Sequence, residues 1–355
     1  MSDLDIQENI NLAPYTTMKI GGRARFFVPA ESENDVIEAL KFAVERSINV
    51  FVLGGGSNVL ISDNGFDGLV LQVGILGSEV LSGSQLSTSS SEFQESKLVT
   101  AGAGEDWDGF VAFCVGRDLA GLECLSGIPG FVGGTPVQNV GAYGQEVAES
   151  IVSVRCLDRD SLEIVELTNE DCRFSYRNSI LNSTAIGRYI VLSVTFSLIE
   201  NGEPKVAYKD IREYFGERRP TLGEVREAVL AIRRAKSMVI DADDPNSRSA
   251  GSFFKNPVVS NDDFAKIQES FPGAPCFVVD ERSVKVPAAW LIENAGFQKG
   301  FALGRAGISS KHTLAIINRG GATSGEIVAL KDHIQSTVEQ HFGIRLQPEP
   351  IFVGF

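Results

Sequence analysis

One segment restricts the fold of this chain more than any other: Ser126–Gly144, S-G-I-P-G-F-V-G-G-T-P-V-Q-N-V-G-A-Y-G. Its nineteen residues include six glycines and two prolines, which excludes a regular helix or strand along its length. The segment is nevertheless apolar, with side chains such as Ile128 and Phe131. An irregular apolar loop must satisfy its own backbone polar groups, and such loops commonly wrap a ligand. We expect either a buried structural loop or a ligand loop in which Gln138 and Asn139 bind the edges of a flat heterocycle.

Helical and extended patterns alternate in the first part of the chain. Ser32 begins a capping-box pattern, and extended runs at 26–29 and 48–53 flank the helix that follows it. We therefore expect a β-α-β unit with parallel strands. The predicted buried face of this helix comprises Ile37, Leu40 and Val44.

Beyond residue 150 the pattern predicts an antiparallel meander followed by helices. The β-rich runs, separated by polar turns, are 152–157, 163–167 and 189–198. A helix is expected earlier, over about 107–117, and capping or stop signals predict three more: from Thr221, from Pro287 to Gly296, and from Thr323 or Ser324 to Gly343. An extended tail, 344–355, completes a mixed α+β pattern.

Two further segments are typical of surface insertions. Residues 77–96 carry eight serines, as in a mobile loop or hairpin tip. Residues 241–249, D-A-D-D-P-N-S-R-S, form a polar connector that favours a domain hinge.

Composition narrows the functional classes. A length of 355 residues suggests two or three domains, and 43% hydrophobic with 22% charged residues is ordinary for globular proteins. The net charge of −14 disfavours nucleic acid and anionic membrane surfaces as partners. Residues 1–13 lack a signal-peptide pattern, the apolar run 190–199 is too short to span a bilayer, and five scattered cysteines favour neither disulfides nor zinc. The sequence predicts a cytoplasmic protein.

The short glycine run Gly54-Gly55-Gly56-Ser57-Asn58 follows the second predicted strand. Its backbone N–H groups, together with the side chains of Ser57 and Asn58, would suit a pyrophosphate, although a tight turn has the same pattern. The chain contains neither a P-loop nor a G-x-G-x-x-G motif, which disfavours a P-loop ATPase and a Rossmann site. Its three histidines have no metal-ligand spacing, so no metal is predicted.

Seven motifs, taken together and in this order, resemble one known family. They are T-T-M-K-I-G-G (16–22), L-G-G-G-S-N (53–58), the Ser126–Gly144 segment, Y-R-N-S (176–179), A-G-S-F-F-K-N-P (250–257), A-W-L-I-E (289–293) and P-E-P (348–350). The chain is similar to the UDP-N-acetylenolpyruvoylglucosamine reductases, the MurB flavoenzymes of bacterial cell-wall precursor synthesis. The resemblance covers nearly the whole chain, and the Ser126–Gly144 motif is highly specific.

The resemblance implies an α+β fold with non-covalent FAD. A two-part FAD-binding domain of the vanillyl-alcohol-oxidase (PCMH) type would comprise 1–73 and 74–237, with the tail 343–355 returning to the first part, and 238–342 would bind substrate. The implied FAD-binding residues are Gly54, Gly55, Gly56, Ser57, Asn58, Gly102, Gly104, Ser126, Ile128, Pro129, Gly130, Gly133, Gly134, Gln138, Asn139, Gly141, Ala142 and Tyr143.

The implied reaction reduces an enolpyruvyl ether of UDP-N-acetylglucosamine to the lactyl ether, UDP-N-acetylmuramate, with NADPH as co-substrate. Ser252 matches the proton donor, Arg177 the arginine that faces the enolpyruvyl group, and Glu349 its acidic partner. A forked guanidinium suits an enolate carboxylate, and a pre-positioned serine can protonate a carbanion-like carbon.

Further matches concern the nucleotide. Tyr208 and Lys236 correspond to the residues that clamp the uridine diphosphate, and the implied neighbours are Tyr176, Asn256, Lys285 and His312. Tyr208 places the chain with the longer form of the family, which closes a loop over the substrate. The 241–249 insertion lengthens the spacing from Lys236 to Ser252, and the serine-rich segment is a second departure from the family pattern.

Two other readings remain open at the level of sequence. One is another flavin oxidoreductase of the same fold that acts on a sugar or alcohol, with Cys114 or Cys124 available as a covalent flavin tether. The other is a non-catalytic nucleotide-sugar binder, which would have no need of Arg177, Ser252 and Glu349 together. No protein partner is implied, and a monomer is expected.

Overall fold

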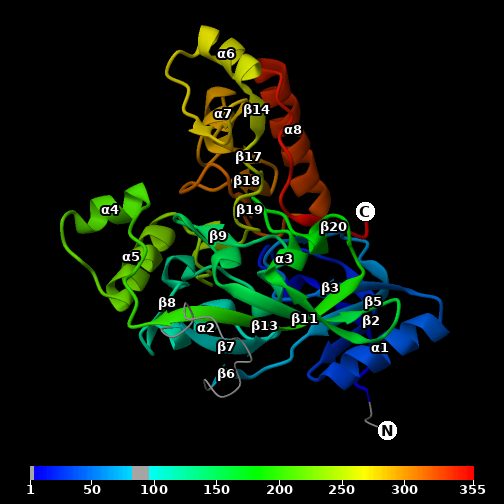
Figure 1. Ribbon diagram of the computed structural model, residues 1–355. Coiled ribbons are helices and arrows are strands. Elements are labelled where there is room, and N and C mark those ends of the chain that lie inside the picture. Colours follow the sequence, from blue (N-terminus) through cyan, green and yellow to red (C-terminus); the bar gives the residue numbers. More distant parts are fainter. Residues whose placement is uncertain (1–3, 82–95) are drawn as a thin grey trace. The chain divides into compact units, whose positions relative to one another are not determined.

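The computed structural model describes residues 4–81 and 96–355, and the chain divides into two compact units (Figure 1). Unit 1 comprises the described parts of Met1–Ile10, Ala24–Gly56 and Asp67–Val239. Unit 2 comprises Asn11–Arg23, Ser57–Phe66 and Ile240–Phe355. Helices and strands occur in both units, which confirms the predicted mixed α and β class.

The first sheet confirms the predicted β-α-β unit. Its strand order is β1-β2-β5-β3, and its elements are β1 (Gln7–Asn11), β2 (Arg23–Ala30), β3 (Asn49–Leu53) and β5 (Phe66–Val73). Strand β3 runs parallel to β5. Gly74 donates a hydrogen bond to Ala30 at one end of the β2–β5 pair and Gly65 lies against Arg23 at the other, so β2 is parallel to β5 as well. The connection from β2 to β3 therefore passes over an inserted central strand.

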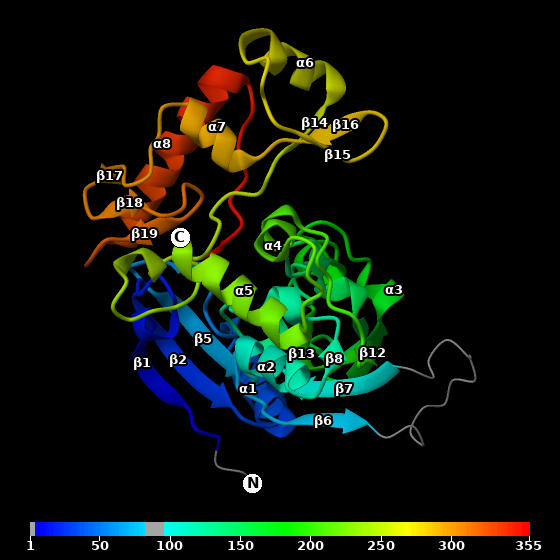
Figure 2. The same cartoon turned by 90° about the vertical axis from the view of Figure 1, so that its left-hand side faces the viewer.

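Helix α1 (Glu33–Glu45) covers one face of this sheet (Figure 2). The Ser32 hydroxyl caps its start by accepting a hydrogen bond from the Asp35 N–H at 3.2 Å. The buried face is centred on Val36, Leu40 and Ala43. Val44 is 74% exposed, so its predicted burial is wrong. The buried stripe runs one residue earlier than predicted and leaves Val44, in the last turn, at its edge.

The second sheet of unit 1 is antiparallel, in the order β12-β11-β13-β7-β6, with β8 on the far end of β13. Its strands are β6 (Ser78–Leu81), β7 (Ser96–Gly102), β8 (Leu119–Ala120), β11 (Ile151–Asp158), β12 (Ile164–Thr168) and β13 (Tyr189–Glu200). The antiparallel prediction is confirmed, but the meander order is wrong because β13 pairs with β11 and not with β12. Strand β12 is largely exposed and forms the edge, whereas β11 and β13 are largely buried.

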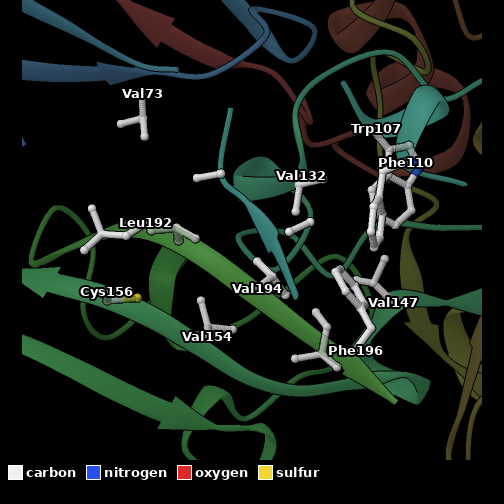
Figure 3. Close-up of a cluster of buried hydrophobic side chains, with 14 of the residues drawn as sticks. Val73, Trp107, Phe110, Val132, Val147, Val154, Cys156, Leu192, Val194 and Phe196 are labelled. Atoms are coloured by element: carbon white, nitrogen blue, oxygen red, sulfur yellow. The ribbon is translucent and has the colours of Figure 1, made fainter. Parts of the chain in front are cut away.

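Side chains from β11, β13 and the helix α2 (Trp107–Val115) meet in the main core of unit 1 (Figure 3). Trp107 and Phe196 are fully buried there, with ring centroids 6.0 Å apart. Most of the predicted serine-rich segment, residues 82–95, lies outside the described residues; on either side of it, β6 and β7 pair with each other.

A smaller core holds two helices of unit 1 together. The helices are α4 (Lys209–Phe215) and α5 (Leu222–Ala235), and they share a cluster that includes Ile211, Val225 and Val229. The predicted capping box of Thr221 and Glu224 is present at the start of α5. The remaining short elements of unit 1 are β9 (Gly141–Ala142), β10 (Gln145–Glu146) and α3 (Asn169–Cys172).

Unit 2 packs its helices around Phe253, Leu291 and Ile327. The predicted last helix is present as α8 (Ser324–Phe342), with Thr323 as N-cap and Gly343 in the left-handed conformation, φ 67°, at its end. The extended tail contains β20 (Ile351–Val353), which pairs in parallel with β4 (Val59–Ile61). The other elements are β14 (Val258–Ser260), α6 (Asn261–Ser270), β15 (Phe277–Val278), β16 (Ser283–Lys285), α7 (Ala288–Asn294), β17 (Ala302–Leu303), β18 (Ala306–Ile308) and β19 (Ile316–Asn318).

The predicted connector 241–249 begins two residues after unit 1 ends at Val239. It forms a compact turn in which the Ser247 hydroxyl donates to the carbonyl of Asp241 at 2.7 Å. In the described part of the chain, no helix is long and apolar enough to cross a membrane.

Candidate functional site

The two glycine-rich loops predicted to bind one ligand touch each other in unit 1. A Cβ added to Gly55 would lie 2.7 Å from the Gly130 Cα and 2.9 Å from its carbonyl carbon. Such distances leave no space for a methyl group, so the two backbones approach as closely as glycine permits. By contrast, a Cβ on Gly54 or Gly134 would meet no atom within 4 Å. The loops thus join backbone to backbone, with open space beside the joint.

A third segment, residues 102–107, closes against the same loops. Gly130 and Gly133 are tied to it because the Trp107 N–H donates to the Gly130 carbonyl at 3.0 Å and the Gly133 N–H to the Ala103 carbonyl at 2.9 Å. A Cβ on Gly133 would lie 2.6 Å from the Ala103 Cβ, and one on Gly104 would lie 2.3 Å from the Gly74 carbonyl carbon. Gly102 is equally tight, at 2.3 Å from the Ile75 oxygen.

The chemistry of the 54–57 turn fits an anionic ligand. Within residues 4–81 and 96–355, the backbone N–H groups of Gly54, Gly55, Gly56 and Ser57 donate to no protein acceptor. Successive free N–H groups in a glycine turn form an anion-binding concavity. This cradle, which a side chain at Gly55 would disrupt, is therefore compatible with the pyrophosphate of FAD.

Other predicted residues of the Ser126–Gly144 segment stabilise the loop itself. The Asn139 side chain, 1% exposed, donates to Glu146 at 2.8 Å and to the Ser175 carbonyl at 3.1 Å, and accepts from the Ala148 N–H at 3.2 Å. Ser126, also buried, donates to the Glu123 carbonyl at 2.7 Å. Because these polar groups are occupied within the protein, Asn139 and Ser126 stabilise the loop conformation. Ile128, Pro129, Gln138, Gly141, Ala142 and Tyr143 are half-buried along the same loop.

Arg177, in the Y-R-N-S turn, contacts this loop through its side chain. Its Nη2 donates to the Gly141 carbonyl at 2.7 Å, and its guanidinium lies 5.5 Å from the ring centroid of Tyr176. Arg177 has φ 54°, in the left-handed region that non-glycine residues rarely occupy. A strained residue with a forked, permanently charged group is a typical feature of a ligand-binding site.

Two of the predicted nucleotide residues, Tyr208 and Lys236, form a cluster with Tyr143, which was predicted to bind FAD. The rings of Tyr143 and Tyr208 meet edge to face with centroids 5.5 Å apart, and the Lys236 Nζ lies 6.0 Å from the Tyr143 ring. Lys236 also donates to Asp210 at 3.0 Å. Arg233, one turn before Lys236 on α5, is almost fully buried, and its Nε has no partner among the described residues.

These surroundings change the acidity of the cluster. Burial lowers the pKa of Lys236, but the hydrogen bond to Asp210 and the neighbouring phenols of Tyr143 and Tyr208 outweigh it, so the pKa lies above its ordinary value. Burial raises the pKa of Tyr143, in spite of the opposing charges of Arg233 and Lys236. Both raised pKa values keep Lys236 cationic and the Tyr143 phenol neutral at neutral pH, which suits a diphosphate.

Unit 2 brings Ser252, Glu349 and Asn58 into one neighbourhood. Phe254 pairs with Pro348 in an antiparallel bridge, and the Glu349 N–H donates to the Phe253 carbonyl at 2.9 Å. On its other side, the Glu349 carbonyl accepts from the Asn58 side chain at 3.4 Å. The stiff P-E-P segment is thus fixed between the residue after Ser252 and the end of the glycine turn.

The three remaining predicted substrate residues lie in unit 2, where the segment of Asn256 runs beside that of Lys285. The Asn256 side chain accepts from the Ala288 N–H at 2.9 Å and so caps helix α7. Lys285 lies in β16 and is half-buried, and so is His312, whose carbonyl accepts from the Ala315 N–H at 3.1 Å.

Comparisons with known proteins identify the family. Residues 243–353 match the UDP-N-acetylenolpyruvoylglucosamine reductase C-terminal domain, and residues 24–168 match an FAD-binding domain. The reductase of that name from Thermobifida fusca is 41% identical over 98% of this chain and 97% of its own length. The chain belongs to the UDP-N-acetylenolpyruvoylglucosamine reductase family.

Other members of this reductase family agree with that assignment. The Streptomyces coelicolor reductase is 42% identical over 97% of this chain and 89% of its own length. The crystal structure of the Thermus caldophilus reductase (MurB) shares the fold, with a TM-score of 0.66, 24% identity and 99% coverage of both chains.

Sequence reasoning missed Asp210 and Arg233 of this family member. Asp210 comes two residues after Tyr208, and Arg233 comes three residues before Lys236 on the same helix. Residues three apart share a helix face, so the Arg233 position is readable from spacing alone. The Asp210–Lys236 pair depends on tertiary packing of α4 on α5, which the sequence does not display.

Proposed function

We propose that the chain reduces UDP-N-acetyl-3-O-(1-carboxyvinyl)-glucosamine to UDP-N-acetylmuramate, as an FAD-dependent reductase that consumes NADPH. The observation that carries the proposal is the joint of the 54–57 and 130–134 loops, whose glycines leave free N–H groups beside open space. Membership of the reductase family supplies the substrate. The 54–57 and 130–134 loops would hold FAD, which would supply the hydride-transfer chemistry between NADPH and the β-carbon of the enolpyruvyl group.

Arg177 is proposed to bind the carboxylate of the enolpyruvyl group. The Arg177 guanidinium is held in place by two hydrogen bonds that it donates to the loop. The acceptors are the carbonyl oxygens of Gly141, at 2.7 Å, and Asn139, at 3.5 Å. Such a fixed cation stabilises negative charge that develops on the carboxylate and α-carbon during reduction. Its planar fork matches a carboxylate better than an ammonium does.

Ser252 is proposed to donate the proton that the α-carbon receives. A free serine is a poor acid, but a carbanion-like acceptor and fixed geometry compensate. The pairing of residues 253–255 with 347–349 supplies that fixed geometry and brings the Glu349 segment beside Ser252. We propose that Glu349 directs its own side-chain carboxyl group at the reacting centre.

Tyr208 and Lys236 are proposed to bind the diphosphate of the substrate and of NADPH in turn, with Tyr143 of the FAD loop beside them. Lys236 supplies the charge and Tyr208, at the N-terminus of α4, closes over the nucleotide. Tyr176, Asn256, Lys285 and His312 are proposed as further polar contacts. One shared pocket predicts ping-pong kinetics.

The domain roles follow from the same proposal. Residues 1–73 and 74–237 would form the two parts of the FAD-binding domain, 238–342 the substrate domain, and the tail 343–355 returns through β20, which pairs with β4. We further propose a cytoplasmic monomer without nucleic acid, membrane or protein partners; the net charge of −14 disfavours nucleic acid and anionic membrane surfaces.

Oxidases of this fold often tether their flavin covalently, and the competing oxidase reading leaves a tether through Cys114 or Cys124 open. Cys114 and Cys124 are both fully buried, and burial raises the pKa of each thiol to about 12. A thiol of that kind is a poor nucleophile for covalent flavinylation. Acid precipitation is therefore expected to release all flavin from the protein, whereas flavin in the pellet would favour the oxidase.

Rapid-mixing kinetics of Ser252→Ala test the proposal. Flavin reduction by NADPH should keep its wild-type rate, and reoxidation by the enolpyruvyl substrate should slow by several orders of magnitude, because only the second step needs the proton. Ser336→Ala, on the exposed side of α8, is the control and should leave both rates unchanged. Equal slowing of both steps in Ser252→Ala would contradict the proton-donor role.

A further inference from the structure

Glu123 occupies an unusual position next to the nucleotide cluster. It is 1% exposed, and both of its carboxylate oxygens accept hydrogen bonds from the main chain. Oε2 accepts from the Gly121 N–H at 2.8 Å, and Oε1 accepts from the Lys205 N–H at 2.8 Å. Oε1 also lies 3.4 Å from the Gln145 side-chain nitrogen. One buried side chain thus joins three separate segments of unit 1.

The first of these segments leads to Tyr208. Strand β13 ends at Glu200 and helix α4 starts at Lys209, so Lys205 lies in the connection between them. Among the described residues, the hydrogen bonds that hold this connection between Gly202 and Tyr208 are those of Lys205. Its N–H is bound by Glu123, and its carbonyl accepts from the Cys124 thiol at 3.0 Å. Residues 123 and 124 therefore hold both backbone groups of Lys205, three residues before Tyr208.

The second segment leads to Tyr143. Gln145 lies two residues after Tyr143, and its side-chain oxygen accepts from the Cys124 N–H at 2.9 Å while its nitrogen faces Glu123. Tyr143 has φ 49°, so its ring position depends on a backbone conformation that its own preference does not favour. Glu123 and Cys124 thus fix both segments that carry the edge-to-face pair of Tyr143 and Tyr208, whose ring centroids are 5.5 Å apart.

We infer that Glu123 is a positioning residue for nucleotide binding: it sets the Tyr208 segment against Tyr143 and so keeps the diphosphate clamp assembled. This inference rests on the proposed function, because the nucleotide ligands are those of the reductase. Glu123 touches neither tyrosine ring in any hydrogen bond and acts through Lys205 and Gln145. Glutamate suits the position because the two N–H groups of Gly121 and Lys205 require two acceptor oxygens.

Glu123→Gln keeps the size of the side chain but replaces one acceptor oxygen with an NH2 group. One of the two backbone N–H groups, of Gly121 or Lys205, then loses its partner. We expect KM for NADPH and for the enolpyruvyl substrate to rise about tenfold, the change that corresponds to one lost hydrogen bond. The dissociation constant of UDP, measured by calorimetry, should rise by a similar factor, with kcat and bound flavin near wild-type values.

A second measurement reads the position of the segment without reference to activity. Trypsin cleaves after Lys209 and Arg212 of α4, and a released 203–208 connection should make this cleavage faster in Glu123→Gln. Cys124→Ala removes the other tie to Lys205 and should act in the same direction, which keeps the test available where Glu123→Gln does not fold. Glu38→Gln is the matched control: the same substitution weakens only the exposed ion pair with Lys41 on α1, and should change neither UDP affinity nor the cleavage after Lys209.

The outcomes separate the inference from the function on which it rests. Faster cleavage with weaker UDP binding and unchanged kcat supports the positioning role. Unchanged cleavage, or unchanged UDP affinity in spite of faster cleavage, overturns it. If NADPH does not reduce the flavin of the wild-type protein, the proposed function is refuted. The cleavage comparison would still show whether Glu123 holds the 203–208 connection in place.

Discussion

The joint between the glycine turns makes a quantitative prediction for Gly55→Ala. The new methyl group would lie 2.7 Å from the Gly130 Cα, against at least 3.4 Å for ordinary contact, so the loops must separate by about 0.7 Å. Both partners are backbone atoms, so no side chain can rotate away to relieve the clash. Gly54→Ala, one residue earlier in the same turn, adds the same methyl group where no atom lies within 4 Å.

The size of the effect follows from the cost of overpacking. Forcing an extra methyl into a closed site typically costs about 1–3 kcal/mol. At about 2–4 °C per kcal/mol, the apoprotein of Gly55→Ala should melt about 2–12 °C below wild type. If the cost of about 1–3 kcal/mol is instead incurred when FAD binds, the affinity for FAD should fall by about 5- to 150-fold.

Thermal unfolding of the two apoproteins and flavin fluorescence titration measure these changes. Gly54→Ala apoprotein should melt like wild type, because its methyl group meets nothing. Equal melting temperatures for Gly55→Ala and Gly54→Ala would refute the loop contact. A wild-type FAD affinity in a destabilised Gly55→Ala protein would show that the joint is not the cofactor site.

Three further predictions concern thiols, acid stability and the substrate carboxylate. Thiol titration at pH 8 should detect one reactive cysteine in the native protein, the exposed Cys276, and five after denaturation. The other four are buried, and burial raises the pKa of each thiol. Four or five reactive thiols in the native protein would contradict the packing. The N–H groups of Thr323 and Arg305 lower the pKa of Glu326 to about 2, so its stabilising contribution is complete above about pH 4.5 and is lost as the pH falls toward 2. The melting-temperature difference between wild type and Glu326→Gln should accordingly shrink over that range, and a constant difference would count against the capping geometry. Arg177→Lys keeps the charge but loses the fork, so substrate-driven reoxidation should slow by about 100-fold with flavin reduction unchanged; an equal loss in both steps would point to a damaged loop.

Local signals in the sequence predicted local structure well. The capping pairs at Thr221 and Thr323, and the stop at Gly343, depend on hydrogen bonds between residues close in the chain, and all three are present. The strand order of the second sheet depends on pairing between distant residues, and the burial of Val44 depends on which face of the helix packs against the sheet; both predictions were wrong.

The candidate site shows the same limit. Glycine content indicated that backbone must approach something closely, but only the folded chain shows that Gly55 approaches Gly130. Asp210 and Arg233 escaped notice because their importance comes from contacts with Lys236 and burial beside Tyr143, neither of which leaves a motif. The proposed clamp and catalytic residues were predicted from resemblance to the family, because isolated tyrosines, lysines and serines carry no signal of their own.

The visible spectrum of the purified protein, taken without oxygen, tests the central claim most directly. The account predicts a flavin band that bleaches on addition of NADPH and returns when the enolpyruvyl nucleotide is added, with UDP-N-acetylmuramate as product. A protein that does not take up FAD, or a bleached flavin that the enolpyruvyl nucleotide fails to reoxidise, would contradict it.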